Sequence, residues 1–316
     1  MYAKPAQTAQ KRGPRARRWC FSPTRLKPRH VKLRPPLICA ILALPWLVPG
    51  RAASAAAESP SPPAPVSAAV VARFRFDAGA PLVAPAGVAP DGTICVGTTD
   101  GYIHALAPDG SYRWSYSVHG AVVHRPLFAG ALWYIATSAE RVYAFTREGG
   151  LYWVFKPPSA IASELAVDAS GLLYFVAADQ FLYGVTAHGG VSLRAAFGAL
   201  AAGPSGAPDG AVWALNQAGN VLRAHGQDVR RFGPEAAPEL DFGAPDTLRD
   251  PEGHLWRVQN GALTFSATQA AEPSNLSLGN SPLLTPVWSS AAHYAVVSAR
   301  SGVVMAVDPP RTRQAQ

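Results

Sequence analysis

Two histidines separated by a short apolar segment are the first candidates for chemistry in this chain. His119 and His124 flank residues 120–123, and Arg125 follows directly. Two imidazoles are able to bind zinc, but a zinc site requires three or four protein ligands, and the sequence specifies no third ligand nearby. We therefore predict no metal here and retain His119, His124 and Arg125 as candidates for ligand contact, because links between repeats commonly reach the site where ligands bind.

Motifs for catalysis are missing from the sequence. Four carboxylates, Asp91, Asp100, Asp109 and Asp209, each precede a glycine, a pairing that favours tight turns over acid–base chemistry. The chain contains no Asp-x-Asp-x-Asp-Gly calcium loop, no Gly-x-Ser-x-Gly nucleophile turn and no phosphate-binding loop. We predict a protein that is not an enzyme, with no catalytic residue, no cofactor and no metal.

A repeated pattern fills the chain from about residue 81 and explains most of these residues. Successive copies are 39 to 42 residues apart, measured between equivalent strand residues. These equivalent residues are Ala105, Ala144, Gly184, Arg223, Thr264 and Ala306. A period near 40 with strand and hairpin-turn signals throughout predicts an all-β fold, a β-propeller of about six four-stranded blades.

Closure of the ring is predicted from the two ends of the repeat region. The last repeat ends near Asp308 without a final strand, whereas residues 71–77 precede the first repeat. In this early segment, Arg73-Phe74 matches Arg113-Trp114 of the first repeat. We predict that the N-terminal strand completes the sixth blade and so pairs two open edges. A degenerate blade within residues 225–250 would raise the count to seven.

Aromatic residues recur at fixed positions of the repeat. Trp133, Trp213 and Trp256 each follow a turn glycine by three residues, in a slot that Cys95 fills in the first repeat. Repetition at one position favours packing in the core over ligand recognition or thiol chemistry. Since Cys20 and Cys39 lie in the predicted signal, the mature chain would retain Cys95 alone and form no internal disulfide.

The charge distribution argues against nucleic-acid binding. The chain has a net charge of +8, but its first 55 residues hold 12 Lys and Arg and no Asp or Glu. The remaining residues hold 16 Lys and Arg against 20 Asp and Glu. The folded part is therefore mildly acidic, without the basic surface that phosphate contacts require.

The N-terminal region is typical of an export signal. The apolar run Leu37–Val48 is too short to span a bilayer, follows Lys32 and Arg34, and precedes small residues that allow cleavage after Ala55 or Ala57. We assign residues 1–55 to a signal peptide with an extended basic segment, with Val31 as a possible true start. Residues 56–68 form a Pro/Ala/Ser-rich linker, residues 69–310 the propeller and residues 311–316 a tail. The mature protein would be periplasmic or secreted, without a membrane span.

The repeats resemble those of the PQQ-like (pyrrolo-quinoline quinone type) β-propellers. The resemblance rests on two stretches of sequence. These are Gly92–Leu106 followed by Gly110–Trp114, and Arg141–Phe145 followed by Gly149–Trp153. In that family the repeat ends in a Gly-to-Trp stretch whose Trp docks against the next blade, which implies this role for Trp114 and Trp153. The family includes quinoprotein alcohol dehydrogenases and a propeller lipoprotein of the outer-membrane β-barrel assembly machine. The dehydrogenases use eight blades and a vicinal disulfide. The mature chain, with Cys95 alone, could not form such a disulfide.

These observations favour an exported, non-enzymatic propeller that acts as a protein-binding or assembly scaffold in the bacterial cell envelope. The partner would be another envelope protein, and the paired edges and small charge of the folded part favour a monomer. The alternatives are a quinoprotein-type oxidoreductase and a small-molecule or carbohydrate-binding sensor, each using the central channel.

Overall fold

The computed structural model describes residues 71–233, 247–259, 262–266, 274–277 and 281–309. All described residues belong to one compact unit. The predicted signal peptide, the linker at 56–68 and the tail at 311–316 lie outside the described residues. Within the described ranges there is no helix long and apolar enough to cross a membrane.

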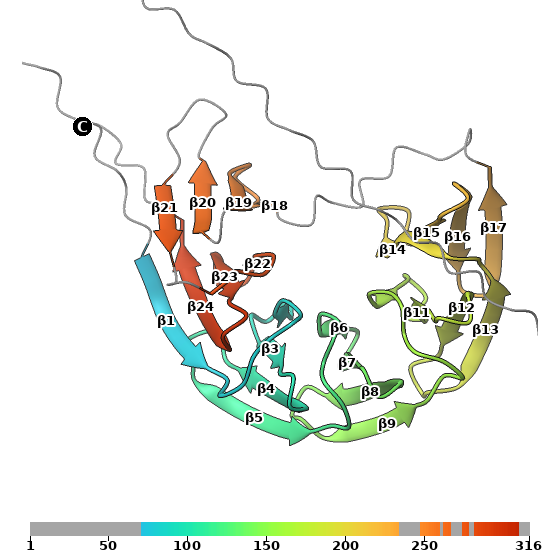
Figure 1. Cartoon of the computed structure of the whole chain (residues 1–316), viewed down its shortest axis with the longest axis horizontal. Coiled ribbons are helices and arrows are strands. Elements are labelled where there is room, and N and C mark those ends of the chain that lie inside the picture. Colours follow the sequence, from blue (N-terminus) through green and yellow to red (C-terminus); the bar gives the residue numbers. More distant parts are fainter. Residues whose placement is uncertain (1–70, 234–246, 260–261, 267–273, 278–280, 310–316) are drawn as a thin grey trace, which may run out of the picture. The chain divides into compact units, whose positions relative to one another are not determined.

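The described residues of this unit form six antiparallel sheets of four strands each (Figure 1). Blade 1 holds β2 (Gly87–Val88), β3 (Ile94–Gly97), β4 (Tyr102–Leu106) and β5 (Tyr112–Ser117). Blade 2 holds β6 (Leu127–Ala129), β7 (Leu132–Thr137), β8 (Arg141–Thr146) and β9 (Leu151–Phe155). Blade 3 holds β10 (Ala166–Val167), β11 (Leu173–Val176), β12 (Phe181–Val185) and β13 (Val191–Ala196).

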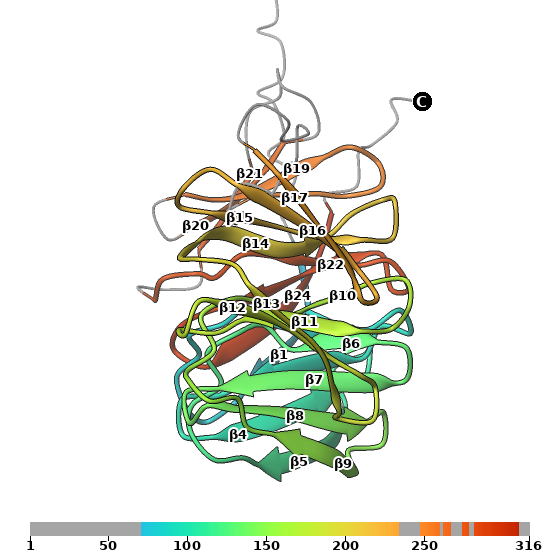
Figure 2. The ribbon, with the colours of Figure 1, turned by 90° about the vertical axis from the view of Figure 1, so that its right-hand side faces the viewer.

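The later blades follow the same order. Blade 4 holds β14 (Leu200–Gly206), β15 (Val212–Asn216), β16 (Val221–His225) and β17 (Asp228–Phe232). Blade 5 holds β18 (Thr247–Arg249), β19 (Leu255–Gln259), β20 (Ala262–Ser266) and β21 (Ser274–Ser277). Blade 6 holds β22 (Val287–Ser289), β23 (Tyr294–Ser298), β24 (Val303–Asp308) and the early strand β1 (Val71–Asp77). Figure 2 shows one blade, β6 to β9, with its strands side by side in chain order.

The predicted closure of the last blade by the N-terminal strand is confirmed. Strand β1 pairs with β24 in antiparallel fashion, with Phe74 opposite Ala306. Trp114 stands opposite Ala105 in blade 1 in the same way, as does Trp153 opposite Ala144 in blade 2. The strand that begins the domain thus takes the outer position of a blade whose other strands end it, and it covers the edge of β24 that would otherwise be unpaired.

Burial explains why these segments become strands. Every residue of β3, β11 and β23 is buried, as expected for strands covered by a neighbouring blade on each face. The outer strand β5 instead alternates exposed and partly covered residues. Clusters of buried side chains join blades 1 and 2, 2 and 3, 3 and 4, 5 and 6, and 6 and 1. Hydrophobic contact between neighbouring sheets is therefore what holds these blades together.

Three of the four turn carboxylates have the structural role that the sequence predicts. The Oδ1 atoms of Asp91 and Asp109 accept hydrogen bonds from the backbone N–H groups of Thr93 and Ser111, at 3.0 and 2.9 Å. Asp209 Oδ1 accepts one from the backbone N–H of the second residue after it in the same way, at 3.0 Å. A carboxylate that binds the backbone two residues later stabilises the turn itself.

Candidate functional site

The inner strands of three consecutive blades enclose a pocket of about 350 Å³. Strands β6, β10 and β14 line it together with the residues just before the first two of them. The first strands of neighbouring blades contact one another, as β2 does with β6 and β22, and β10 with β14. The pocket therefore faces the centre of the ring of blades, the place where propellers commonly hold ligands.

One acidic residue organises the charged part of this pocket. Glu164 Oε2 accepts a hydrogen bond from the backbone N–H of Arg125 at 3.1 Å, and Glu164 Oε1 lies 3.6 Å from Nδ1 of His124. The Nε2 atom of His124 lies 3.4 Å from the carbonyl oxygen of Ile161. The structure thus brings together two of the three predicted link residues, His124 and Arg125, around a carboxylate from the next link.

The third predicted link residue lies apart from the pocket. The backbone N–H of His119 donates to Oη of Tyr143 at 3.0 Å, and its exposed side chain is not among the pocket residues. His119 and His124 are therefore not placed to bind one ligand together in this pocket.

Sequence reasoning missed Glu164, although the repeat contained a signal for it. Arg125 precedes the first residue of β6 by two positions, and Glu164 precedes the first residue of β10 by two. The two residues are therefore equivalent in successive blades and approach each other in front of neighbouring inner strands. Comparison of the links, and not only of the strands, would have paired them.

Arg125 offers the pocket an available cation. Its side chain is exposed, and in the described residues its guanidinium has no ion pair or hydrogen bond. Pro204 closes the opposite wall as a buried residue of β14. A pocket of mixed polarity under a guanidinium is suited to a carboxylate or carbonyl group of a partner, since guanidinium binds such oxygens through paired hydrogen bonds.

The predicted structural tryptophans divide into two groups. Trp133 and Trp256 are 0% exposed, and Trp213 is partly buried against Phe232, with ring centroids 5.5 Å apart. Trp114 and Trp153 lie on outer strands, where their Nε1 groups donate to carbonyl oxygens of the following blade. None of the five belongs to the channel pocket.

One group of three metal-ligating side chains exists in the described ranges, and it lies elsewhere. Asp250, Glu252 and His254 have ligand atoms within 4.8 Å of one another. Asp250 is buried, however, and accepts hydrogen bonds from the backbone N–H of His254 at 2.8 Å and from Nε1 of Trp256 at 3.1 Å. Its Oδ2 atom also lies 2.8 Å from Nδ1 of His254. These contacts hold the turn between β18 and β19, so a structural role accounts for Asp250 and His254, while Glu252 is exposed.

The sheets, their order and their central pocket define a β-propeller of about six blades. The sequence matches the family model described as outer membrane protein assembly factor BamB over residues 64–309. The chain belongs to this family of PQQ-like propellers. A comparison with curated proteins finds no matching sequence.

The solved structures that this chain resembles are distant in sequence. The Pan2 WD40 domain of Neurospora crassa is 10% identical, with a TM-score of 0.56 over 78% of this chain and 98% of that domain. A catalytically inactive virginiamycin B lyase from Staphylococcus aureus with quinupristin is 10% identical, with a TM-score of 0.49 over 75% of this chain and 98% of the lyase. At this identity the similarity to the WD40 domain concerns the propeller fold alone.

Proposed function

We propose that this protein is an exported, non-enzymatic propeller that binds a protein partner and serves as an assembly scaffold in the bacterial cell envelope. The observation that carries the proposal is the family match over residues 64–309, because the family is described as an outer membrane protein assembly factor. The predicted signal at residues 1–55, with cleavage after Ala55 or Ala57, supports an envelope location.

The channel pocket supports a contact with an extended segment of another protein. Arg125 presents a guanidinium at the pocket rim, while Glu164 holds the backbone beneath it and keeps the link in place. A partner loop with an acidic residue or a free carbonyl would satisfy this cation. The proposed partner is therefore an envelope protein that places such a loop over the links of blades 2 and 3.

Site-specific crosslinking in the native cell tests the proposal. A photoreactive p-benzoylphenylalanine at Gly206, an exposed residue of the pocket wall, keeps the Arg125 guanidinium in place and should form a reproducible crosslink to an envelope protein, identified by mass spectrometry. The same group at Glu148, an exposed residue of the β8–β9 turn at the other end of blade 2, is the control and should not capture that protein. If neither position yields a protein partner, or both capture the same ones, the proposed contact is wrong.

The location is tested separately. N-terminal sequencing of the protein from a periplasmic extract should give a chain that begins at residue 56 or 58. A protein found in the cytoplasm with residues 1–55 attached would contradict the envelope role, whatever its partner.

A further inference from the structure

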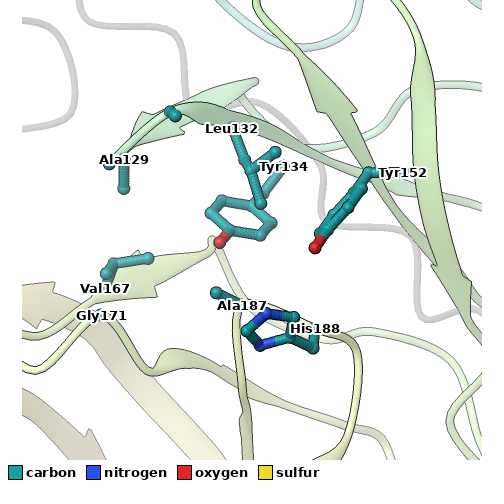
Figure 3. A pocket seen from close by; sticks show the side chains of 10 residues that line it. Ala129, Leu132, Tyr134, Tyr152, Val167, Gly171, Ala187 and His188 are labelled. Carbon is teal, nitrogen blue, oxygen red and sulfur yellow. The ribbon is translucent and has the colours of Figure 1, made fainter.

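A second pocket, of about 340 Å³, lies between blades 2 and 3 at the end of β6 opposite to Arg125. The turns β6–β7, β10–β11 and β12–β13 surround it, together with strands β7 and β9. Its walls are mainly apolar and include Leu132, Val167 and Ala187 (Figure 3). Apolar walls with a few polar groups are the usual composition of small-molecule sites.

The hydroxyl of one buried tyrosine opens on this pocket. Tyr134 is 2% exposed, and its ring packs against Trp153 with centroids 5.9 Å apart. Figure 3 shows its hydroxyl directed into the space between Val167 and Ala187. No described residue forms a hydrogen bond with it, and the pocket leaves the hydroxyl accessible to water or to a ligand.

The Tyr134 hydroxyl keeps its proton and can therefore donate a hydrogen bond. Burial raises the pKa of Tyr134 above its ordinary value, so the phenol stays neutral throughout the physiological range. A group that carries a hydrogen-bond acceptor would therefore fit opposite the Tyr134 Oη atom.

Two exposed aromatic residues flank the opening. The rings of Tyr152 and His188 lie 6.3 Å apart between centroids, inclined by 53° (Figure 3). Flat rings at a pocket mouth favour another ring, because aromatic pairs gain from tilted and stacked contacts. The lining residues include no Lys, Arg, Asp or Glu, so the pocket offers a charged ligand no full countercharge.

We propose that this pocket binds an uncharged, single-ring aromatic molecule whose carbonyl or similar acceptor meets the Tyr134 hydroxyl. The pocket volume lies near the lower limit for ligand sites, which suits one ring with a short substituent. The inference does not depend on the scaffold role, since the pocket and the Arg125 rim occupy opposite ends of β6.

A matched pair of probes tests the inference with the intact protein. Acetophenone carries a ring and a carbonyl, whereas ethylbenzene has nearly the same shape and no acceptor. Ligand-observed NMR titrations should show saturable binding of acetophenone to the wild-type protein, tighter than that of ethylbenzene. Tyr134→Phe removes only the hydroxyl, and it should weaken acetophenone binding about two- to tenfold, the range for one neutral hydrogen bond, while leaving ethylbenzene unchanged.

Two further variants separate binding from folding. Tyr183→Phe is the matched control, because the Tyr183 hydroxyl already donates to Asp179 Oδ2 at 2.6 Å, and the change should leave both probes unaffected. Ala131→Trp at the exposed rim should block both probes. The proposal is wrong if neither probe binds saturably to the wild-type protein, or if Tyr134→Phe binds acetophenone as tightly as wild type does.

Discussion

The indole of Trp153 lies directly over the α carbon of Gly189 in the next blade. A Cβ atom at Gly189 would come within 3.0 Å of Cγ of Trp153, and Trp153 Nε1 donates to the carbonyl oxygen of Ala187 at 2.7 Å. Trp114 has the same relation to Gly149 of the following blade, and so does Phe74 to Gly110. The outer aromatic residue of one blade therefore docks on a turn glycine of the next in three consecutive positions.

This docking predicts a difference between two adjacent glycines. Gly189 has a φ of 84° and lies under Trp153, whereas a Cβ at Gly190 would meet only Oγ1 of Thr186 at 3.4 Å. We expect Gly189→Ala to lower the free energy of unfolding by about 1–3 kcal/mol, the usual cost of a residue forced into a strained backbone conformation. Gly190→Ala should stay within about 0.5 kcal/mol of wild type. Urea unfolding midpoints measure both, and equal values for the two variants would contradict the docking role.

The closing strand should contribute stability through one side chain. Phe74 packs edge-on against Tyr294 with ring centroids 6.2 Å apart and lies over Gly110. Since the ring is only partly buried, Phe74→Ala should cost about 2–3 kcal/mol, near or below the lower end of the range for buried Phe truncations. Arg75→Ala, an exposed position on the same strand, is the control. Hydrogen exchange of the β24 amides should accelerate in the first variant only; equal exchange in both would mean that blade 6 does not depend on this contact.

The repeat made the fold predictable from the sequence, and it did so for a physical reason. Each blade buries its second and third strands against neighbours, so the apolar segments and their turn glycines must recur at one spacing. The residue types alone are enough to match Arg73-Phe74 to Arg113-Trp114, because the closing strand has to present the same side chain to the next blade. The register of Phe74 opposite Ala306 follows from that requirement.

The pockets were predictable only in part. Arg125 and His124 were found because two histidines flank one link, but Glu164 was not, since its only signal is its equivalence to Arg125 two residues before the next inner strand. The pocket of Tyr134 was hidden for a different reason. Tyr134 and Tyr152 line it from blade 2 and Ala187 from blade 3, and the sequence contains no pattern that places three such residues around one cavity.

A buried carboxylate between blades 3 and 4 should matter as much as the aromatic docking. Asp168 Oδ2 accepts hydrogen bonds from Tyr174 Oη at 3.0 Å and from the backbone N–H of Gly226 at 2.5 Å. Burial alone would raise the pKa of Asp168, but the donors, Gly226 foremost, outweigh it and hold the pKa below its ordinary value of 3.8. This stability is present above pH 3.8 and is lost as the pH falls toward the folded-state pKa.

Asp168→Asn should therefore cost about 2–3 kcal/mol at pH 7, because hydrogen bonds to a charged acceptor are replaced by weaker or missing ones. The difference from wild type should shrink as the pH falls below 3.8. Asp228→Asn, an exposed carboxylate on the neighbouring strand, should change stability by less than about 0.5 kcal/mol. Chemical denaturation at a series of pH values measures all three proteins, and a pH-independent difference would show that the charge of Asp168 is not involved.

The last prediction concerns a histidine that lies among aromatic rings. His104 has ring centroids 5.7 Å from Phe76, 6.2 Å from Tyr102 and 6.5 Å from Tyr112, and neither of its buried nitrogens has a hydrogen-bond partner in the described residues. Burial lowers the pKa of His104 below its ordinary value of 6.5, although the nearby charge of Asp100 opposes this. Folding therefore favours the neutral ring.

The sign of the pH effect follows from that preference. Above pH 6.5 both states are neutral at this position, and below it the unfolded chain binds a proton that the folded protein resists, so stability falls with falling pH. His104→Leu should remove this dependence, because blades 4 and 5 already carry Leu222 and Leu263 at the same repeat position. We expect the two proteins to differ least at about pH 8 and the variant to gain relative to wild type toward about pH 5.5, by less than about 1.4 kcal/mol per pH unit. Parallel stability profiles over this interval would mean that the buried ring is protonated as easily in the folded protein as in the unfolded chain.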